Sequence, residues 1–193
     1  VGGLVGVNYG GMIENSEATG NVTGNGEKIG GLIGTNTSIS PSRDDAMVRS
    51  SFATGNVSGG NKVGGFVGKN DDKVYSSFST GVTSGESQVG GLVGSNAGDG
   101  AVDASYAAGP VSGNQDTGGL VGVNGANVSG SYWDTEATGQ NDGIGRGSPD
   151  GTTGLSTNEM QGDSAEENMD SFDFMDTWQI VTGDYPTLSW EDI

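Results

Sequence analysis

The sequence contains no cysteine and no histidine among its 193 residues. Without cysteine the chain has no disulfide framework and no thiolate nucleophile. Without histidine it cannot build a Ser-His-Asp or Cys-His triad, and most zinc-binding residue sets are excluded. We therefore expect a protein that is not an enzyme and that needs no metal and no cofactor.

Basic residues are scarce, because 7 Lys and Arg stand against 25 Asp and Glu, a net charge of −18. A chain this acidic should repel nucleic acid and anionic lipid. No run of 18 apolar residues is present, so we expect no membrane insertion by this segment. Leu, Ile, Val and Phe together number only 36. Something other than a large aliphatic core must therefore order the chain.

Glycine is abundant, with 39 copies, and many of them belong to a repeat. The block VGGLVG and its near-copies begin at Val1, Ile29, Val63, Val89 and Thr117, at spacings of 28, 34, 26 and 28 residues. A second block, of the type Ser-Phe-Ala-Thr-Gly, alternates with the first. The 34-residue spacing marks an insertion within Thr37–Arg49, which contains Pro41 and Arg43. We interpret it as a surface loop; a contact face is the alternative.

Each repeat consists of short runs of β-branched and aromatic residues separated by Gly, Asn and Ser, which indicates short strands joined by turns. A period near 28 residues predicts an all-β fold, a right-handed parallel β-solenoid (β-helix) of about five rungs over residues 1–139. Residues 140–193 hold 12 acids and one base. A capping box at Ser156 and Glu159 and two strand-like runs predict an acidic C-terminal α+β cap, with a short helix and two strands, packed on the last rung.

Alternation along a strand would place Leu4 and its equivalents on the inner face, with the valines of the opposite face half covered. The same inner face carries one asparagine per repeat. We expect these side chains to stack as a hydrogen-bonded ladder. They are Asn8, Asn36, Asn70, Asn96 and Asn124. A ligand-binding row is the alternative interpretation. An aromatic column is predicted to stack in the core rather than to bind sugar; it comprises Phe52, Phe78, Tyr106 and Tyr132.

Three pairs of acids could in principle perform acid–base chemistry or bind Ca²⁺. They are Asp71 with Asp72, Asp99 with Asp103, and Asp134 with Glu136. None of them recurs at the repeat period, so we interpret them as solvated surface acids. The glycine-rich stretch Gly143–Gly147 lacks the strand–helix context of a nucleotide loop. Sequons at Asn21, Asn56 and Asn127 are candidate N-glycosylation sites, whereas the sequon at Asn36 falls in the ladder.

The alternating GGLVG-x-Asn and Ser-Phe/Tyr blocks resemble the GLUG repeat family. The closing sequence SYWDTEATGQ, with YPTLSW further on, is similar to the segment that commonly ends such arrays. The resemblance implies a secreted or cell-surface bacterial or archaeal protein, often large and multidomain, and it supplies no catalytic residues. GLUG repeats also occur as non-catalytic parts of some bacterial immunoglobulin-A peptidases.

These observations favour a non-catalytic structural or adhesive module of an extracellular protein, filament or appendage from a salt-rich environment. One alternative is a carbohydrate-binding or carbohydrate-cleaving β-solenoid such as a virion tail-fibre module. The other is a passive stalk of a secreted peptidase. The chain opens inside a motif, at Val1. We therefore expect a longer protein and contacts from other subunits or domains at the N-terminal rung, and surface glycans are further candidate partners.

Overall fold

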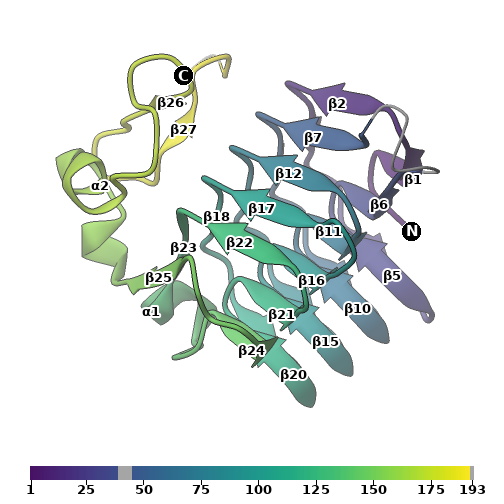
Figure 1. Cartoon of the computed structure of the whole chain (residues 1–193). Coiled ribbons are helices and arrows are strands. Elements are labelled where there is room, and N and C mark those ends of the chain that lie inside the picture. The colour runs from purple at the N-terminus through teal and green to yellow at the C-terminus, as the bar shows by residue number, and fades with distance from the viewer. Residues whose placement is uncertain (39–44, 192–193) are drawn as a thin grey trace.

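The computed structural model of the protein describes residues 1–38 and 45–191. The protein is a stack of parallel coils with a C-terminal segment folded against the flank of the stack (Figure 1). This confirms the predicted parallel β-solenoid. Each coil contributes one short strand to each of up to five sheets, which we number by their first strand. Pro41 and Arg43 of the predicted insertion lie outside the described residues.

All pairings within these five sheets are parallel and in register, so equivalent residues of successive repeats lie side by side. Sheet 1 contains β1 (Val5–Tyr9), β6 (Ile33–Thr37), β11 (Val67–Asn70), β16 (Val93–Asn96), β21 (Val121–Asn124) and β24 (Ile144–Gly147). Sheet 2 contains β2 (Met12–Glu14), β7 (Met47–Arg49), β12 (Lys73–Tyr75), β17 (Ala101–Asp103) and β22 (Asn127–Ser129). Sheet 3 contains β3 (Glu17–Ala18), β8 (Phe52–Ala53), β13 (Phe78–Ser79), β18 (Tyr106–Ala107), β23 (Ser131–Asp134) and β25 (Thr152–Leu155).

The last two sheets close each coil and lead into the next one. Sheet 4 contains β4 (Val22–Thr23), β9 (Val57–Ser58), β14 (Thr83–Ser84) and β19 (Val111–Ser112). Sheet 5 contains β5 (Glu27–Gly30), β10 (Asn61–Gly64), β15 (Ser87–Gly90) and β20 (Gln115–Gly118). The remaining elements are α1 (Thr135–Thr138), a 3₁₀ turn (Thr157–Glu159), α2 (Asp163–Asn168) and the antiparallel pair β26 (Trp178–Gln179) and β27 (Thr187–Leu188).

The VGGLVG block forms a corner and not the single alternating strand that we predicted. In the third copy, β10 ends at Gly64 and β11 begins at Val67, so Gly65 and Phe66 turn the chain between sheets 5 and 1. A Cβ atom on Gly64 would lie 2.1 Å from the carbonyl oxygen of Val67, which explains why this corner requires glycine.

Because of this corner, the apolar residues on both sides of it are buried, in two separate cores. Val63 at the first position of the block faces Ile29, Val89 and the valines of sheet 4. Phe66 and Val67 face the side chains of sheets 2 and 3. We predicted that the valines of this block would be only half covered. That prediction is wrong, because Val63 and Val67 are both fully buried. Each core is narrow, because every position in it is filled by one column of equivalent side chains from successive coils. A small number of aliphatic residues is therefore enough to order the chain.

The coiled region also extends past residue 139. Ile144 of β24 pairs with Val121, and β25 pairs with β23, so sheets 1 and 3 each gain one more strand. The predicted boundary at 139/140 is therefore too early in the chain. It was placed there because we interpreted the Gly-Ile-Gly pattern at 143–145 as part of a glycine-rich loop. The capping box is present at the 3₁₀ turn, where the backbone N–H of Ser156 donates to Glu159 Oε2 at 2.8 Å, while α2 starts only at Asp163.

Residues 140–155 of the predicted cap lie on the last rung, where β24 and β25 add to sheets 1 and 3. The rest of the cap, residues 156–191 (the C-terminal segment), covers the flank of the stack instead, which corrects our prediction for this part. Figure 1 shows it running back beside the coils toward their N-terminal end. Trp190 stacks on Phe52 at a centroid distance of 5.7 Å, and its indole N–H donates to Ser50 O at 2.8 Å. The physical reason is that the aromatic side chains that four sheet 3 strands turn to this flank need an apolar cover; they are Phe52, Phe78, Tyr106 and Tyr132.

Candidate functional site

The five predicted ladder asparagines lie in one column at the end of sheet 1. The side-chain amide nitrogen of Asn8 donates to Asn36 Oδ1 at 2.9 Å, and the same bond links each asparagine to the next as far as Asn124, at 2.9 to 3.0 Å. The three central members are completely buried. Further amide bonds reach carbonyl groups of the turn that follows, as from Asn70 to Asp72 O at 2.7 Å. The column therefore fixes the corner between sheets 1 and 2 in every coil.

A second ladder, of serines, was not predicted. In each of the first four coils the backbone N–H of the serine donates to the hydroxyl oxygen of the serine one coil later, at 3.1 to 3.4 Å. Each hydroxyl in turn donates to the carbonyl two residues earlier, as from Ser77 to Tyr75 O at 2.7 Å. The members are Ser16, Ser51, Ser77, Ser105 and Ser131. The signal was present in the sequence, since serine begins all five copies of the second block.

The aromatic column lies between the stack and the C-terminal segment. Phe52, Phe78 and Tyr106 stack in parallel, with centroid distances of 4.9 and 5.0 Å and interplanar angles of 8° and 4°. Trp178 and Phe172 of the C-terminal segment pack against this column. The phenol of Tyr106 donates to Pro186 O at 2.8 Å. These contacts bury the column, as the sequence predicted.

A groove remains at the edge of this contact, with a volume of about 400 Å³. It is lined by Phe52, Phe78 and Tyr106 of the aromatic column and by Asp184, Tyr185 and Glu191 of the C-terminal segment. Glu191 accepts the backbone N–H of Leu188 at 2.7 Å. Burial raises the pKa of the Glu191 carboxyl above its ordinary value. The three rings are stacked on one another and nearly buried, so they offer little open ring face to a ligand.

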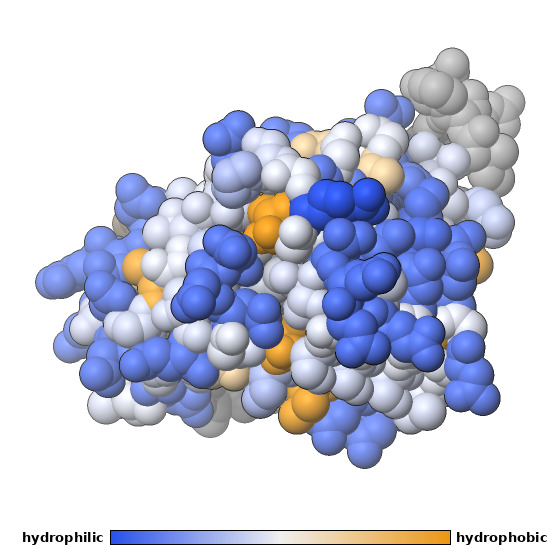
Figure 2. Space-filling view, turned by 90° about the horizontal axis from the view of Figure 1, so that it is seen from below, coloured by the Kyte–Doolittle hydropathy of each residue, from blue (hydrophilic) through white to orange (hydrophobic). Residues whose placement is uncertain are grey.

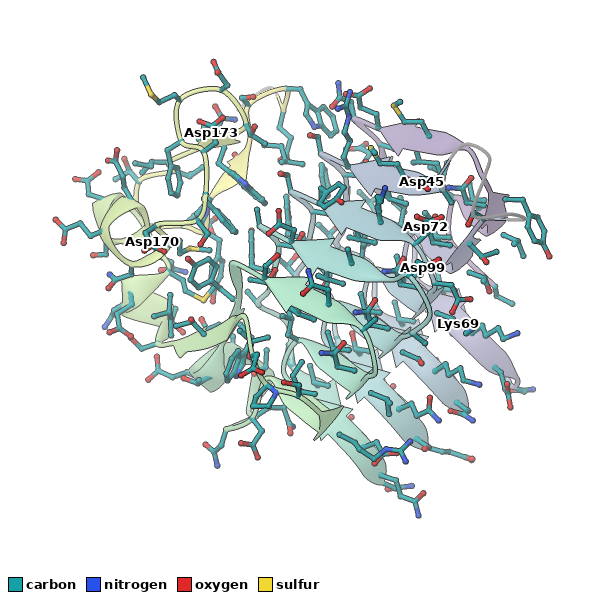
Figure 3. All side chains as sticks on the ribbon, in the orientation of Figure 1. Asp45, Lys69, Asp72, Asp99, Asp170 and Asp173 are labelled. Carbon is teal, nitrogen blue, oxygen red and sulfur yellow. The ribbon has the colours of Figure 1, made fainter. Side chains whose placement is uncertain are left out.

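The acids that we considered as pairs have separate environments, and the prediction of solvated surface acids is wrong for Asp72 and Asp134, which are buried. Asp72 is buried and accepts the backbone N–H of Ala46 at 2.9 Å, whereas Asp71 forms an ion pair with Lys69. Asp103 accepts the hydroxyl of Ser129 at 2.7 Å, and Asp99 is exposed. Figure 3 shows Asp45, Asp72 and Asp99 on the same side of the stack as Lys69, with Asp170 and Asp173 in the C-terminal segment. Within residues 1–38 and 45–191, no three acids are placed to bind a metal ion together.

Asp134 is the most completely enclosed acid of these pairs. It caps α1 by accepting the backbone N–H groups of Glu136 and Ala137, both at 2.8 Å. Its second oxygen accepts the phenol of Tyr185 at 2.6 Å. Glu136 points away and accepts the N–H of Thr157 at 3.0 Å. Asp134 and Glu136 therefore hold the C-terminal segment in place and form no carboxylate dyad.

The buried Tyr106 and the half-buried Tyr185 predict a loss of stability in alkali. Burial raises the pKa of Tyr106 well above its ordinary value, and burial together with the bond to Asp134 raises the pKa of Tyr185. A phenol whose pKa is higher in the fold stabilises it fully below the unfolded value of about 10, and this contribution is lost as the pH rises further. We expect the free energy of unfolding, measured in urea, to fall above about pH 10, by up to about 1.4 kcal/mol per pH unit for Tyr106. Tyr106→Phe should flatten this slope and the exposed control Tyr9→Phe should not; equal slopes in both would contradict the assignment.

The candidate glycosylation sites are exposed. Asn21 and Asn56 lie on adjacent coils just before β4 and β9, and Asn56 donates its backbone N–H to Asn21 Oδ1 at 2.9 Å. Asn127 lies in β22 and its backbone carbonyl accepts the Asn96 amide at 3.0 Å. All three expose side chain to solvent, whereas Asn36 is completely buried in the ladder. The geometry therefore leaves the first three available for modification.

Among the charged residues of the chain, acids outnumber bases by 25 to 7. Figure 2 shows one face that is largely hydrophilic, with small isolated apolar spots. Five ion pairs join described residues, namely Arg49–Glu14, Lys62–Glu27, Lys69–Asp71, Lys73–Asp45 and Arg146–Asp116. Most of the acids in residues 1–38 and 45–191 therefore have no basic side chain against them. Among the helices of the described chain, none has the length and apolar character needed to cross a membrane.

Comparisons with known proteins agree with the repeat pattern. The family model described as "The GLUG motif" matches residues 1–23. Halomucin of Haloquadratum walsbyi (strain DSM 16790 / HBSQ001) is 42% identical over an alignment of 68 residues, and the match covers 32% of this chain and 1% of halomucin. A crystal structure from Bacteroides ovatus, of a protein described as a "putative immunoglobulin A1 protease", superimposes with a TM-score of 0.68 at 22% identity. That match covers 94% of this chain and 58% of the other, and it shows the fold alone.

Proposed function

Because the chain is a β-solenoid of the GLUG repeat family, we propose that it is a non-catalytic structural module of an extracellular, cell-surface protein. The observation that carries the proposal is the continuity of the stack. Every coil is joined to the next by in-register parallel strands and by the asparagine and serine ladders. Such a stack keeps its shape without a large core and holds whatever is attached to it at a fixed distance.

An adhesive role fits the same architecture, since the turns and the flank present repeated polar groups to other proteins or to surface glycans.

Acid–base catalysis, in contrast, needs a carboxyl pair held close together in a cleft. Asp72, Asp103 and Asp134 each accept backbone or hydroxyl donors instead. The test is a turnover screen against polysaccharides and peptides in molar salt, together with glycan-array binding. We expect no turnover; turnover that disappears in Asp134→Asn or Asp72→Asn, with the fold intact, would refute the proposal.

The similarity to halomucin and the charge of −18 support a salt-rich environment for this module. At 0.1 M salt the Debye length is about 10 Å, so neighbouring acids repel each other, whereas at 1 M it is about 3 Å. We therefore expect stability to rise from low to molar NaCl by about 2 kcal/mol, which corresponds to roughly 4–8 °C in Tm for a chain of this size. A thermal unfolding series at several NaCl concentrations measures this.

The control for the salt series removes exposed acids. Asp163→Asn, Glu166→Gln and Glu167→Gln, combined in α2, change the charge without touching the core. This variant should depend less on salt than the parent protein. A flat curve for the parent, or an equal gain in the variant, would count against an adaptation to salt.

The groove beside the aromatic column favours a second candidate, a carbohydrate-binding module. Its lining by Tyr185, Asp184 and Glu191 offers hydroxyl and carboxylate groups to sugar hydroxyls. The same glycan array tests this role. Binding that is lost in Glu191→Gln but kept in the remote exposed variant Asp99→Asn would establish it, and this result would add an activity to the structural module.

A further inference from the structure

A second groove lies on the outer face of sheet 2, and it shares no lining residue with the groove near Glu191. Its volume is about 470 Å³. Glu14, Arg49 and Tyr75 line it; they are the last residues of β2, β7 and β12 and pair with one another in register. Because the preceding residue of β7, Val48, is fully buried, alternation along the strand turns these three side chains outward. Polar and aromatic groups of three successive coils therefore lie side by side.

Arg49 and Glu14 form an ion pair in this groove, with Nη2 of the guanidinium group 2.7 Å from Oε1 of the carboxylate. The two side chains are 45% and 39% exposed, so a ligand can reach both. A guanidinium group carries several N–H donors and a carboxylate two acceptor oxygens. Among the described residues, no other side-chain hydrogen bond engages the guanidinium group of Arg49. The pair can therefore donate to one hydroxyl group of a ligand and accept from its neighbour.

Two serine side chains add hydroxyl groups to the lining. Ser50 and Ser76 have φ angles of 46° and 42°, in the left-handed region that favours glycine. The equivalent residues of the next two coils, Ala104 and Gly130, have the same conformation, so the corner itself does not require serine. Within residues 1–38 and 45–191, neither hydroxyl forms a hydrogen bond, whereas the ladder serine that follows each of them bonds a backbone carbonyl. Both hydroxyls are therefore available to a ligand.

Tyr75 and Met47 supply apolar surface in the same groove. The ring of Tyr75 is partly exposed and stacks on no other aromatic ring of the described chain, unlike the rings of the aromatic column. Thr177 of the C-terminal segment also lines the groove, and its backbone is held by a bond from its N–H to Asp173 O at 3.1 Å. An aromatic ring beside a few fixed polar groups is a combination that binds the apolar face and the hydroxyl groups of a sugar.

The charge of the groove favours a neutral ligand. One base and one acid line it, so the lining itself has no net charge. The next strand places Asp103 beside Tyr75, and the chain as a whole carries a charge of −18. An acidic glycan would therefore be repelled on approach.

We propose that this groove binds a neutral glycan, with one hexose ring against Tyr75. Arg49 would donate to one sugar hydroxyl and Glu14 would accept from the adjacent one, while Ser50 and Ser76 would bond further hydroxyls. Because strands of successive coils lie about 4.8 Å apart, these groups follow one another along the stack, and an oligosaccharide would lie parallel to its axis. This inference rests on the proposed adhesive role of the module and names the ligand class and the site.

The test is isothermal titration calorimetry of the full chain in molar NaCl with neutral tetrasaccharides, cellotetraose and mannotetraose. Arg49→Lys keeps the charge but loses the planar fork of donors. We expect this variant to bind the preferred tetrasaccharide about tenfold more weakly, the loss expected from one hydrogen bond to a charged group. The matched control is Arg146→Lys, which changes another exposed ion pair, with Asp116, and should leave the affinity unchanged.

The serines give a readout that a purely structural role would not give. Ser50→Gly combined with Ser76→Gly should lower the affinity about tenfold, since two hydroxyl partners are lost. The melting temperature should stay equal or rise, because glycine adopts a positive φ without strain. Tyr75→Phe keeps the ring and should bind as the parent does, whereas Tyr75→Ala should bind more weakly.

Several results would overturn the proposal. They are equal affinities of the parent and Arg49→Lys, no binding of either neutral tetrasaccharide, and tighter binding of tetragalacturonate, which would show that Arg49 recognises an acidic sugar. Binding that is lost in Glu191→Gln but kept in Arg49→Lys would assign the sugar to the other groove and would also overturn it. None of these results touches the structural role of the stack, so the two proposals fail separately.

Discussion

Replacing Gly94 with alanine is expected to destabilise the protein by about 3 kcal/mol, at the upper end of what overpacking usually costs. A Cβ atom at this position would lie 2.5 Å from the carbonyl carbon of Lys62 and 2.6 Å from the backbone nitrogen of Val63. Both are backbone atoms of the preceding coil, and a rotamer change cannot move them. Relief would require sheets 1 and 5 to separate, and this would open the apolar columns on both sides of the corner.

The matched control is Gly20→Ala. Gly20 is exposed, and a Cβ atom there would meet no atom within 4 Å, so alanine should be neutral or slightly stabilising. Urea unfolding of both variants at one fixed NaCl concentration gives the comparison. If Gly94→Ala differs from the parent by less than about 0.5 kcal/mol, the range of ordinary surface substitutions, the close contact between the sheets does not exist in solution.

The repeat made the fold predictable, because register follows from sequence when equivalent residues recur at a nearly constant spacing. The parallel pairing and the asparagine column could be placed from five aligned copies alone. The corner at Gly65 and Phe66 could not, since a Gly-Gly pair between apolar residues is compatible both with a strand and with a bend. Only contacts with the neighbouring coil decide between them, as the backbone crowding around Gly64 shows.

The position of the C-terminal segment was beyond prediction for a different reason. Its aromatic residues indicated an apolar cover, but the surface they cover depends on contacts such as that of Trp190 with Ser50, which are 140 residues apart in the chain. No local pattern encodes such a pairing. The same holds for the groove near Glu191, which exists only because this segment crosses the sheet 3 flank.

Replacing Asn96 with leucine tests how much the side-chain hydrogen bonds of the asparagine ladder contribute to stability. Leucine has nearly the same size and branching as asparagine, so the change removes the hydrogen bonds with little change in packing. Asn96 accepts from Asn70 and donates to Asn124 Oδ1 and to Asn127 O. All of these groups lie in or beside the buried column, and they would lose a partner that water cannot easily replace.

We expect Asn96→Leu to lower the free energy of unfolding by roughly 1–3 kcal/mol, the usual cost of a buried polar group left unpaired. The control Asn114→Leu changes an exposed asparagine outside the column and should leave the unfolding midpoint nearly unchanged. Urea titration followed by circular dichroism measures both. Equal midpoints for the two variants would mean that the backbone bonds between the strands order the coils without help from the amide column. A loss confined to Asn96→Leu would show that the buried amide column contributes to the stability of the stack.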